Sequence, residues 1–167
     1  MSAFEVLGLD HLVLRVRQPM RMLDFYCRVL GCQLEREVAE LGLYQLRAGS
    51  QLIDLVDIQG PLGGDGQVPD QCKANLDHFC LLIAPFEVEA LYQYLAKNAV
   101  IYERASQRFG AQGEGLSVYV YDPEGNQVEL KGASDMGSAP APLIVQSYKM
   151  LSVPFKSNVV FFHLVPD

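Results

Sequence analysis

One short pattern occurs twice in this chain, and it constrains the fold more than any other feature. An apolar residue, Asp, His and further apolar residues begin at Leu9 and again at Leu76. The correspondence continues downstream, where a strand-like segment centred on Asp54 matches one centred on Glu129. Each copy of such a duplication is expected to form one structural unit, so it has to be recognised before a fold is assigned.

Both halves have the same order of expected elements, which is a strand, a helix and three further strands. Strands are predicted from apolar residues at a spacing of two, and helices from apolar residues at spacings of three and four. The expected elements of the first half are residues 9–16, 19–30, 32–38, 43–47 and 51–57. Those of the second half are residues 76–83, 86–97, 100–104 (a weak strand signal), 116–121 and 127–131. This order predicts an α+β domain.

Glycine and other turn-forming residues divide the chain. We expect a domain over residues 1–132 with modules at 7–57 and 76–132, joined by the glycine-rich linker 58–75, and a C-terminal extension at 133–167. Within that extension, residues 132–150 are expected to be a tether and residues 151–167 an appended strand. The two helices are expected to end in left-handed residues at Gly31 and Asn98. Residues 106–115 contain three glycines and are predicted to form a mobile loop beside the site, with Arg104 and Arg108.

Charge and composition exclude some classes of partner. The net charge is −7 and the pI is about 4.9, so nucleic acid is not an expected partner, and an anionic substrate would need a local basic feature or a metal. No apolar run approaches the roughly 20 residues that span a bilayer, and no secretory leader is evident. A cytoplasmic protein with reduced cysteines is therefore expected, in which Cys80 is a small buried residue.

The repeat supplies two histidines and two acids at equivalent places, namely His11, His78, Asp54 and Glu129. Taken singly, each has another explanation, because a strand histidine is more often a hydrogen-bonded core residue and Glu129 could face water. Asp54 between apolar neighbours is harder to explain, since an ionised buried carboxylate is costly unless it is paired or bound to a metal. If a twofold relation brings the four together, they suit a divalent transition metal with open positions. His11, His78 and Glu129 alone would form a two-histidine, one-carboxylate set.

Four motifs match a known family: the opening Leu9-Asp10-His11, the segment Phe25–Gly31, the second histidine His78, and the segment from Asp122 to Leu130. In these motifs the chain resembles the vicinal oxygen chelate superfamily over about residues 7–132. That superfamily groups glyoxalase I, fosfomycin-modifying thiol transferases, bleomycin-resistance proteins and extradiol dioxygenases. The resemblance implies paired βαβββ modules forming a curved mixed sheet around a metal, usually in a homodimer.

By resemblance to glyoxalase I, the metal ligands would be His11, Asp54, His78 and Glu129, although a Glu is usual at the place of Asp54. Glu129 would also be the general base that moves a carbon-bound proton in the thiol adduct of an α-oxoaldehyde, while the metal stabilises the developing charge. Arg15 matches an arginine that binds the carboxylate of glutathione, the expected thiol co-substrate, but Ile58 stands where that enzyme has an asparagine. The metal could be nickel, zinc, iron or manganese.

Two other functions remain open from the sequence. One is a three-ligand thiol transferase or ring-cleaving dioxygenase, and the other is a non-enzymatic binding protein of the bleomycin-resistance type. All of these would act on small molecules, with neither nucleic acid nor membrane as a partner.

Overall fold

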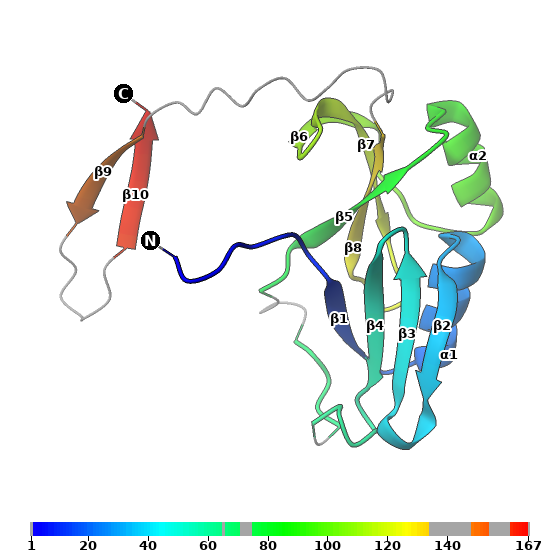
Figure 1. Cartoon of the computed structure of the whole chain (residues 1–167). Coiled ribbons are helices and arrows are strands. Elements are labelled where there is room, and N and C mark those ends of the chain that lie inside the picture. The colour runs from blue at the N-terminus through cyan, green and yellow to red at the C-terminus, as the bar shows by residue number, and fades with distance from the viewer. Residues whose placement is uncertain (1, 65, 71–74, 134–147, 154–160, 167) are drawn as a thin grey trace. The chain divides into compact units, whose positions relative to one another are not determined.

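The computed structural model describes residues 2–64, 66–70, 75–133, 148–153 and 161–166. The chain divides into two compact units, residues 1–134 and residues 135–167. The first unit contains both copies of the repeat (Figure 1).

The first module is a four-stranded mixed sheet with a helical segment. Its strands lie in the order β1-β4-β3-β2, and β1 pairs with β4 in parallel while the other pairs are antiparallel. The elements in chain order are β1 (His11–Val16), α1 (Pro19–Leu23), the π-helical turn η1 (Asp24–Val29), β2 (Gln33–Val38), the short η2 (Ala39–Leu41), β3 (Leu43–Ala48) and β4 (Gln51–Asp57).

The second module repeats this topology, with the strand order β5-β8-β7-β6 and a parallel pairing of β5 with β8. Its elements are β5 (His78–Ile83), α2 (Val88–Lys97), β6 (Ser106–Gly110), β7 (Gly113–Tyr121) and β8 (Gln127–Gly132). The predicted α+β class with paired βαβββ modules is confirmed, but a single chain has two separate four-stranded sheets rather than one continuous sheet.

The two helices end differently, contrary to the expectation from the repeat. Gly31 has a φ of 78° and takes the left-handed conformation as predicted. Asn98 does not, because it is the C-cap residue of α2 and has a φ of −93°. The positive φ, 54°, belongs to the next residue, Ala99. The side chain of Asn98 is used instead to donate to the carbonyl of Tyr94 and to accept from Arg28.

The prediction of a mobile loop at residues 106–115 is wrong, because these residues belong to the antiparallel hairpin of β6 and β7. The weak strand signal at residues 100–104 corresponds only to an isolated bridge between Tyr102 and Val120. The second strand of the module, β6, therefore lies later in the chain than the sequence pattern indicates. Glycine is a poor strand former on its own, and only the pairing with β7 settles its conformation.

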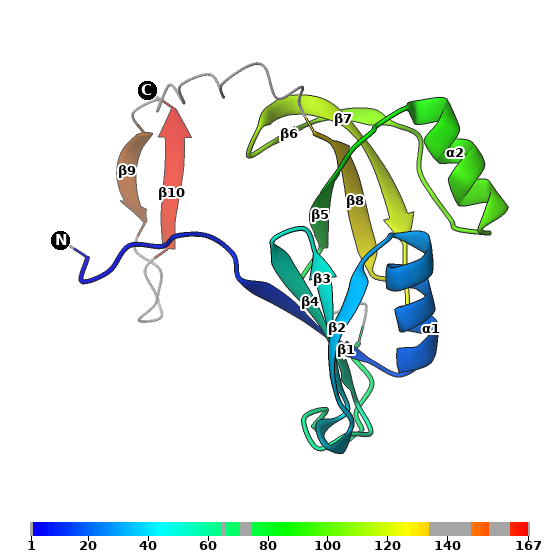
Figure 2. The ribbon, with the colours of Figure 1, turned by 45° about the vertical axis from the view of Figure 1, so that its right-hand side comes forward.

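The helix-bearing faces of both sheets form one core. Figure 2 shows α1 and α2 on the same side of the two sheets. Residues of η1, such as Phe25 and Tyr26, share a cluster of buried side chains with Leu95 of α2 and Val118 of β7. The two modules therefore pack against each other through their helical sides.

Two carboxylates of the turn after β7 tie the modules together. The buried Asp122 accepts a hydrogen bond from the hydroxyl of Tyr26 at 3.0 Å, and burial raises the pKa of Asp122. The equally buried Glu124 accepts from the backbone N–H groups of Arg17 and Gln18, both at 2.7 Å, just before α1 begins. These contacts fix the first helix against the second module.

Replacing Tyr26 by Phe is expected to lower the free energy of unfolding by about 1–3 kcal/mol, because the buried Asp122 loses a donor across the module seam. Tyr94→Phe is the matched control, since it removes a hydroxyl that donates to the carbonyl of Val29 from an exposed side chain. Urea denaturation of the two variants measures the difference. Equal losses in both would show that Asp122 has no special dependence on Tyr26.

The second unit contains an antiparallel hairpin of β9 (Tyr148–Val153) and β10 (Phe161–Pro166). We expected a tether at residues 132–150 and one appended strand at residues 151–167. The hairpin places a strand on each side of residues 154–160, which lie outside the described residues, as does most of the predicted tether. No helix in the described part of the chain is long and apolar enough to cross a membrane.

Candidate functional site

Each sheet has a polar face, which we define as the face opposite the helices. In the second module Val118, Val120, Val128 and Leu130 belong to the core. Because successive side chains of a strand alternate between faces, the residues between them lie on the other side. This polar face carries His78 and Cys80 from β5, Glu129 and Lys131 from β8, and Ser117 and Tyr119 from β7.

Glu129 is the centre of the contacts on this face. Its side chain is buried, Oε1 accepts from the hydroxyl of Ser117 at 2.5 Å, and Oε2 lies 3.3 Å from Nε2 of His78. The hydroxyl of Tyr119 donates to the same Oε2 at 3.4 Å, and its ring meets the His78 ring edge to face. One carboxylate oxygen is thus anchored, and the other is directed toward the imidazole.

The first module carries a similar but looser pair. Asp54 is 6% exposed, and its Oδ2 accepts from Nε2 of Gln45 at 3.1 Å. Its Oδ1 is buried and has no hydrogen-bond partner. A buried carboxylate oxygen without a partner is energetically costly. The single chain therefore leaves the hydrogen-bonding capacity of Oδ1 unsatisfied. His11, which lies two residues before the β1 partner of Asp54, is half exposed.

The Asp before each histidine orients the ring. Nδ1 of His11 lies 2.7 Å from Asp10, and Nδ1 of His78 lies 2.7 Å from Asp77. A carboxylate at Nδ1 favours the N–H tautomer there and leaves Nε2 as the free ring nitrogen. The hydrogen bond to Asp10 is also the main reason that the pKa of His11 is raised, against an opposing effect of desolvation and with a further contribution from Asp54. This role of Asp10 and Asp77 was not predicted, although the repeated Asp-His pair was a visible signal.

The predicted quartet is not assembled within one chain. Among the described residues, no group of three or more His, Cys, Asp or Glu side chains is placed to hold a metal ion. The structure gives two half-sets instead, His11 with Asp54 and His78 with Glu129. The physical reason is the packing of the modules through their helical sides, which leaves the two polar faces on separate sheets.

Arg15 lies on the polar face of β1, but its guanidinium binds the linker. Nε donates to the carbonyl of Gly63 at 3.0 Å, and Nη2 donates to that of Gln67 at 3.0 Å. The predicted carboxylate-binding arginine therefore holds the segment after β4. Cys80 also differs from expectation, because it is exposed rather than buried.

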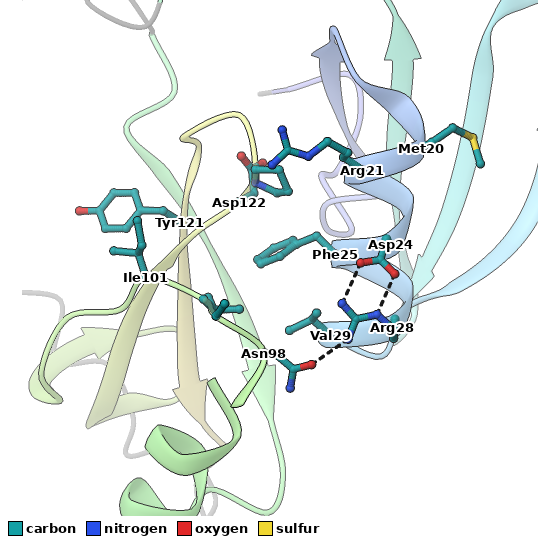
Figure 3. A pocket seen from close by; sticks show the side chains of 13 residues that line it. Met20, Arg21, Asp24, Phe25, Arg28, Val29, Asn98, Ile101, Tyr121 and Asp122 are labelled. Carbon is teal, nitrogen blue, oxygen red and sulfur yellow. Dashed lines mark hydrogen bonds and ion pairs between the residues drawn. The ribbon is translucent and has the colours of Figure 1, made fainter. Parts of the chain in front are cut away.

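A cavity of about 580 Å³ lies elsewhere, between the first helix and the second module (Figure 3). Phe25 and Val29 line one side of it, and Tyr121 and Asp122 line another. At one end Arg28 is bound by Asp24 and Asn98, as the dashed lines in Figure 3 mark. None of the predicted site residues lines this cavity, which belongs to the seam between the modules.

Comparison with known proteins identifies the class. Residues 8–130 match the model of the Glyoxalase/Bleomycin resistance protein/Dioxygenase superfamily. The chain belongs to this superfamily, as its resemblance predicted.

Two individual proteins are similar to this chain over most of its length. A glyoxalase domain-containing protein of Mycosarcoma maydis is 30% identical over 132 residues, which is 78% of this chain and 70% of that protein. A virulence protein of Salmonella typhimurium is 29% identical over 122 residues, covering 73% of this chain and 81% of that one.

A lactoylglutathione lyase of Agrobacterium tumefaciens has a similar solved structure. It has a TM-score of 0.56 and 20% identity, covering 80% of this chain and 98% of that one. At this identity the likeness shows the fold alone.

Proposed function

We propose that this chain is a metal-dependent lyase of the glyoxalase I type, which isomerises the thiol adduct of an α-oxoaldehyde in the cytoplasm. The observation that supports this most is the pairing, on each polar face, of a buried carboxylate with a histidine whose Nδ1 is already engaged. The similar fold of a lactoylglutathione lyase agrees with this reaction but does not establish it.

The donor atoms fit a divalent transition metal. His11 and His78 each have Nδ1 at an aspartate, so that each can offer Nε2. Asp54 offers a buried oxygen without a partner, and Glu129 offers the oxygen that faces His78. Two neutral imidazoles and two carboxylates would balance the charge of a divalent ion.

A second copy of the chain would complete the set. The half-sets lie on separate sheets of one chain, and among the described residues neither half-set has a third His, Cys, Asp or Glu placed to share a metal ion with it. In a dimer with twofold symmetry, the first module of one copy can face the second module of the other, and this happens twice. We propose that His11 and Asp54 of one copy join His78 and Glu129 of its partner.

The residues around Glu129 suit it to move a proton. Oε1 is held by the hydroxyl of the fully buried Ser117, so the carboxylate is fixed while Oε2 stays directed at the polar face. Once it is no longer a metal ligand, Oε2 would accept the carbon-bound proton of the adduct and return it to the neighbouring carbon. A bound divalent ion would supply Lewis-acid stabilisation of the negative charge that develops on the two adjacent oxygens.

The direct test combines two measurements on the purified protein. We expect about one metal ion per chain by elemental analysis, and isomerisation of the methylglyoxal–glutathione adduct when nickel or zinc is supplied. Metal binding without isomerisation would exclude the glyoxalase reaction. Absence of both would favour a non-enzymatic binding protein of the bleomycin-resistance type.

A three-ligand site is the second candidate, and one observation favours it. Asp54 has a shorter side chain than Glu, and its Oδ2 is already engaged by Gln45. His11, His78 and Glu129 would then hold the metal alone, as in a thiol transferase or a ring-cleaving dioxygenase. Iron dependence and oxygen uptake would separate these two chemistries.

Replacing Asp54 by Asn decides between the four-ligand and three-ligand sites. If Asp54 is a ligand, we expect the metal affinity of the Asp54→Asn protein to be at least about tenfold below that of the wild type, because a charged donor is replaced by a neutral amide. Gln45→Leu is the matched control, since it removes the neighbour of Asp54 and leaves the carboxylate in place. Titration with zinc gives both affinities. Unchanged affinity in Asp54→Asn would establish the three-ligand site.

A further inference from the structure

We infer that Arg108 is the anion-recognising residue of this site, and that the substrate carries a carboxylate or a phosphate-like group at the edge of the second module. This inference rests on the proposed function for its location, because it places Arg108 beside the proposed Glu129 and His78 half-set.

The side chain of Arg108 lies next to the contacts of Glu129. It lies on β6, and its guanidinium carbon lies 5.5 Å from the centre of the Tyr119 ring while its Nε donates to the Tyr119 hydroxyl at 3.3 Å. That same hydroxyl donates to Oε2 of Glu129. The guanidinium is therefore one side chain away from the carboxylate oxygen that is proposed to react.

The positive charge of Arg108 is not neutralised by an ion pair within the described part of the chain. Its side chain is exposed. The protein carries a net charge of −7, which disfavours the approach of an anion unless a local cation counteracts it. Arg15, the cation expected for this role, donates to three linker carbonyls, those of Gly63, Gly64 and Gln67. Arg108 donates to one backbone carbonyl, that of Gln107, and to the Tyr119 hydroxyl.

The hairpin that carries Arg108 is built around a second cation. Lys131 is 3% exposed, and its ammonium donates to the carbonyl oxygens of Arg108 and Gly115. An added Cβ would lie 3.3 Å from the Lys131 side chain at Gly110 and 3.4 Å from it at Gly115. The glycines of residues 106–115 thus leave room for the lysine side chain beneath the hairpin. Lys131 fixes the backbone of Arg108 and adds positive charge beneath the same edge.

The ligand class follows from the guanidinium itself. A planar guanidinium binds carboxylate and phosphate oxygens through paired hydrogen bonds, and here the Tyr119 ring supports it from below. A thiol adduct with a terminal carboxylate and a phosphonate or phosphate ester would both satisfy it. The shared chemistry is an oxyanion held a short distance from the reacting carbon.

The chain contains a matched control for the test. Arg104 is also an exposed arginine over a tyrosine ring, 5.2 Å from the centre of Tyr92. Tyr92 is part of α2 and belongs to the core cluster on the helical side. Arg104→Ala therefore removes the same charge and the same kind of stacking at a different place.

The experiment measures equilibrium binding of S-methylglutathione and of inorganic phosphate by calorimetry, using the full chain with zinc present. We expect the wild type to bind at least one of them, Arg108→Ala to bind it about tenfold or more weakly, and Arg104→Ala to stay within about twofold. Selective binding of S-methylglutathione points to a thiol adduct, and selective binding of phosphate points to a phosphate-like substrate. Equal affinity in wild type and Arg108→Ala, equal losses in both variants, or no wild-type binding of either probe would overturn the inference.

Failure here is distinguishable from failure of the proposed function. If the protein isomerises the methylglyoxal adduct and Arg108→Ala keeps its KM, the proposed function stands and this inference falls. If no isomerisation is found but probe binding still depends on Arg108, the reaction is wrong and the anion contact stands. If both hold, Arg108→Ala is expected to raise KM about tenfold with a much smaller effect on kcat.

Discussion

Glu129→Gln is expected to lower kcat for the methylglyoxal–glutathione adduct by about 100- to 10,000-fold, which is the usual contribution of a positioned general base. The substitution keeps the size of the side chain, and the remaining amide oxygen can still accept from Ser117. The oxygen that faces His78 becomes an amide nitrogen or a neutral oxygen, and neither removes a carbon-bound proton. Steady-state kinetics with added nickel or zinc give the value.

Loss of metal could produce the same decline, so the metal content of the variant has to be measured alongside kcat. The control is Glu114→Gln, which removes one negative charge from an exposed position on β7 and is expected to leave kcat within about twofold. A Glu129→Gln protein with wild-type kcat would remove Glu129 from the role of base. A variant that loses both metal and activity would make Glu129 a ligand without resolving the base, and Glu129→Asp with added metal then separates the two roles.

Mixing two inactive variants is expected to restore about a quarter of the wild-type activity, provided that the site is shared between copies. One variant carries His11→Ala and Asp54→Ala, and the other carries His78→Ala and Glu129→Gln. In a mixed dimer one site receives all four substitutions and the other receives none. Random exchange gives about half mixed dimers, each with one intact site of two.

A site built within a single chain predicts a different outcome. Every chain in the mixture would then lack half of its own donors, and no activity would return however completely the subunits exchange. Metal content gives an independent reading, since mixed dimers should bind about one tight metal ion each. Mixing each inactive variant with itself under the same refolding conditions is the control, and activity returning there would show reversion or contamination.

The sequence by itself determined the modules and the composition of each half-set. The strands at residues 11–16, 51–57, 78–83 and 127–132 follow from alternation of side chains, and alternation is a local property that no distant contact has to supply. The repeat placed Asp54 and Glu129 at equivalent positions, while the structure showed that both lie on the face opposite the helices. The structure then supplied the parallel pairing of β1 with β4 and of β5 with β8, which puts each histidine on the strand beside that of its carboxylate.

Tertiary structure decided which way these half-sets face and which charges are free. The hydrogen bond between Tyr26 and Asp122 joins residues far apart in sequence, and with it the modules pack helix side to helix side. Arg15 binds the carbonyls of a linker whose path no local pattern predicts. The glycine-rich segment forms a hairpin that carries Arg108, because it pairs with a strand that the local pattern does not specify as its partner. Periodicity encodes which face a residue takes on its own strand, but only packing between distant segments determines what lies opposite that face.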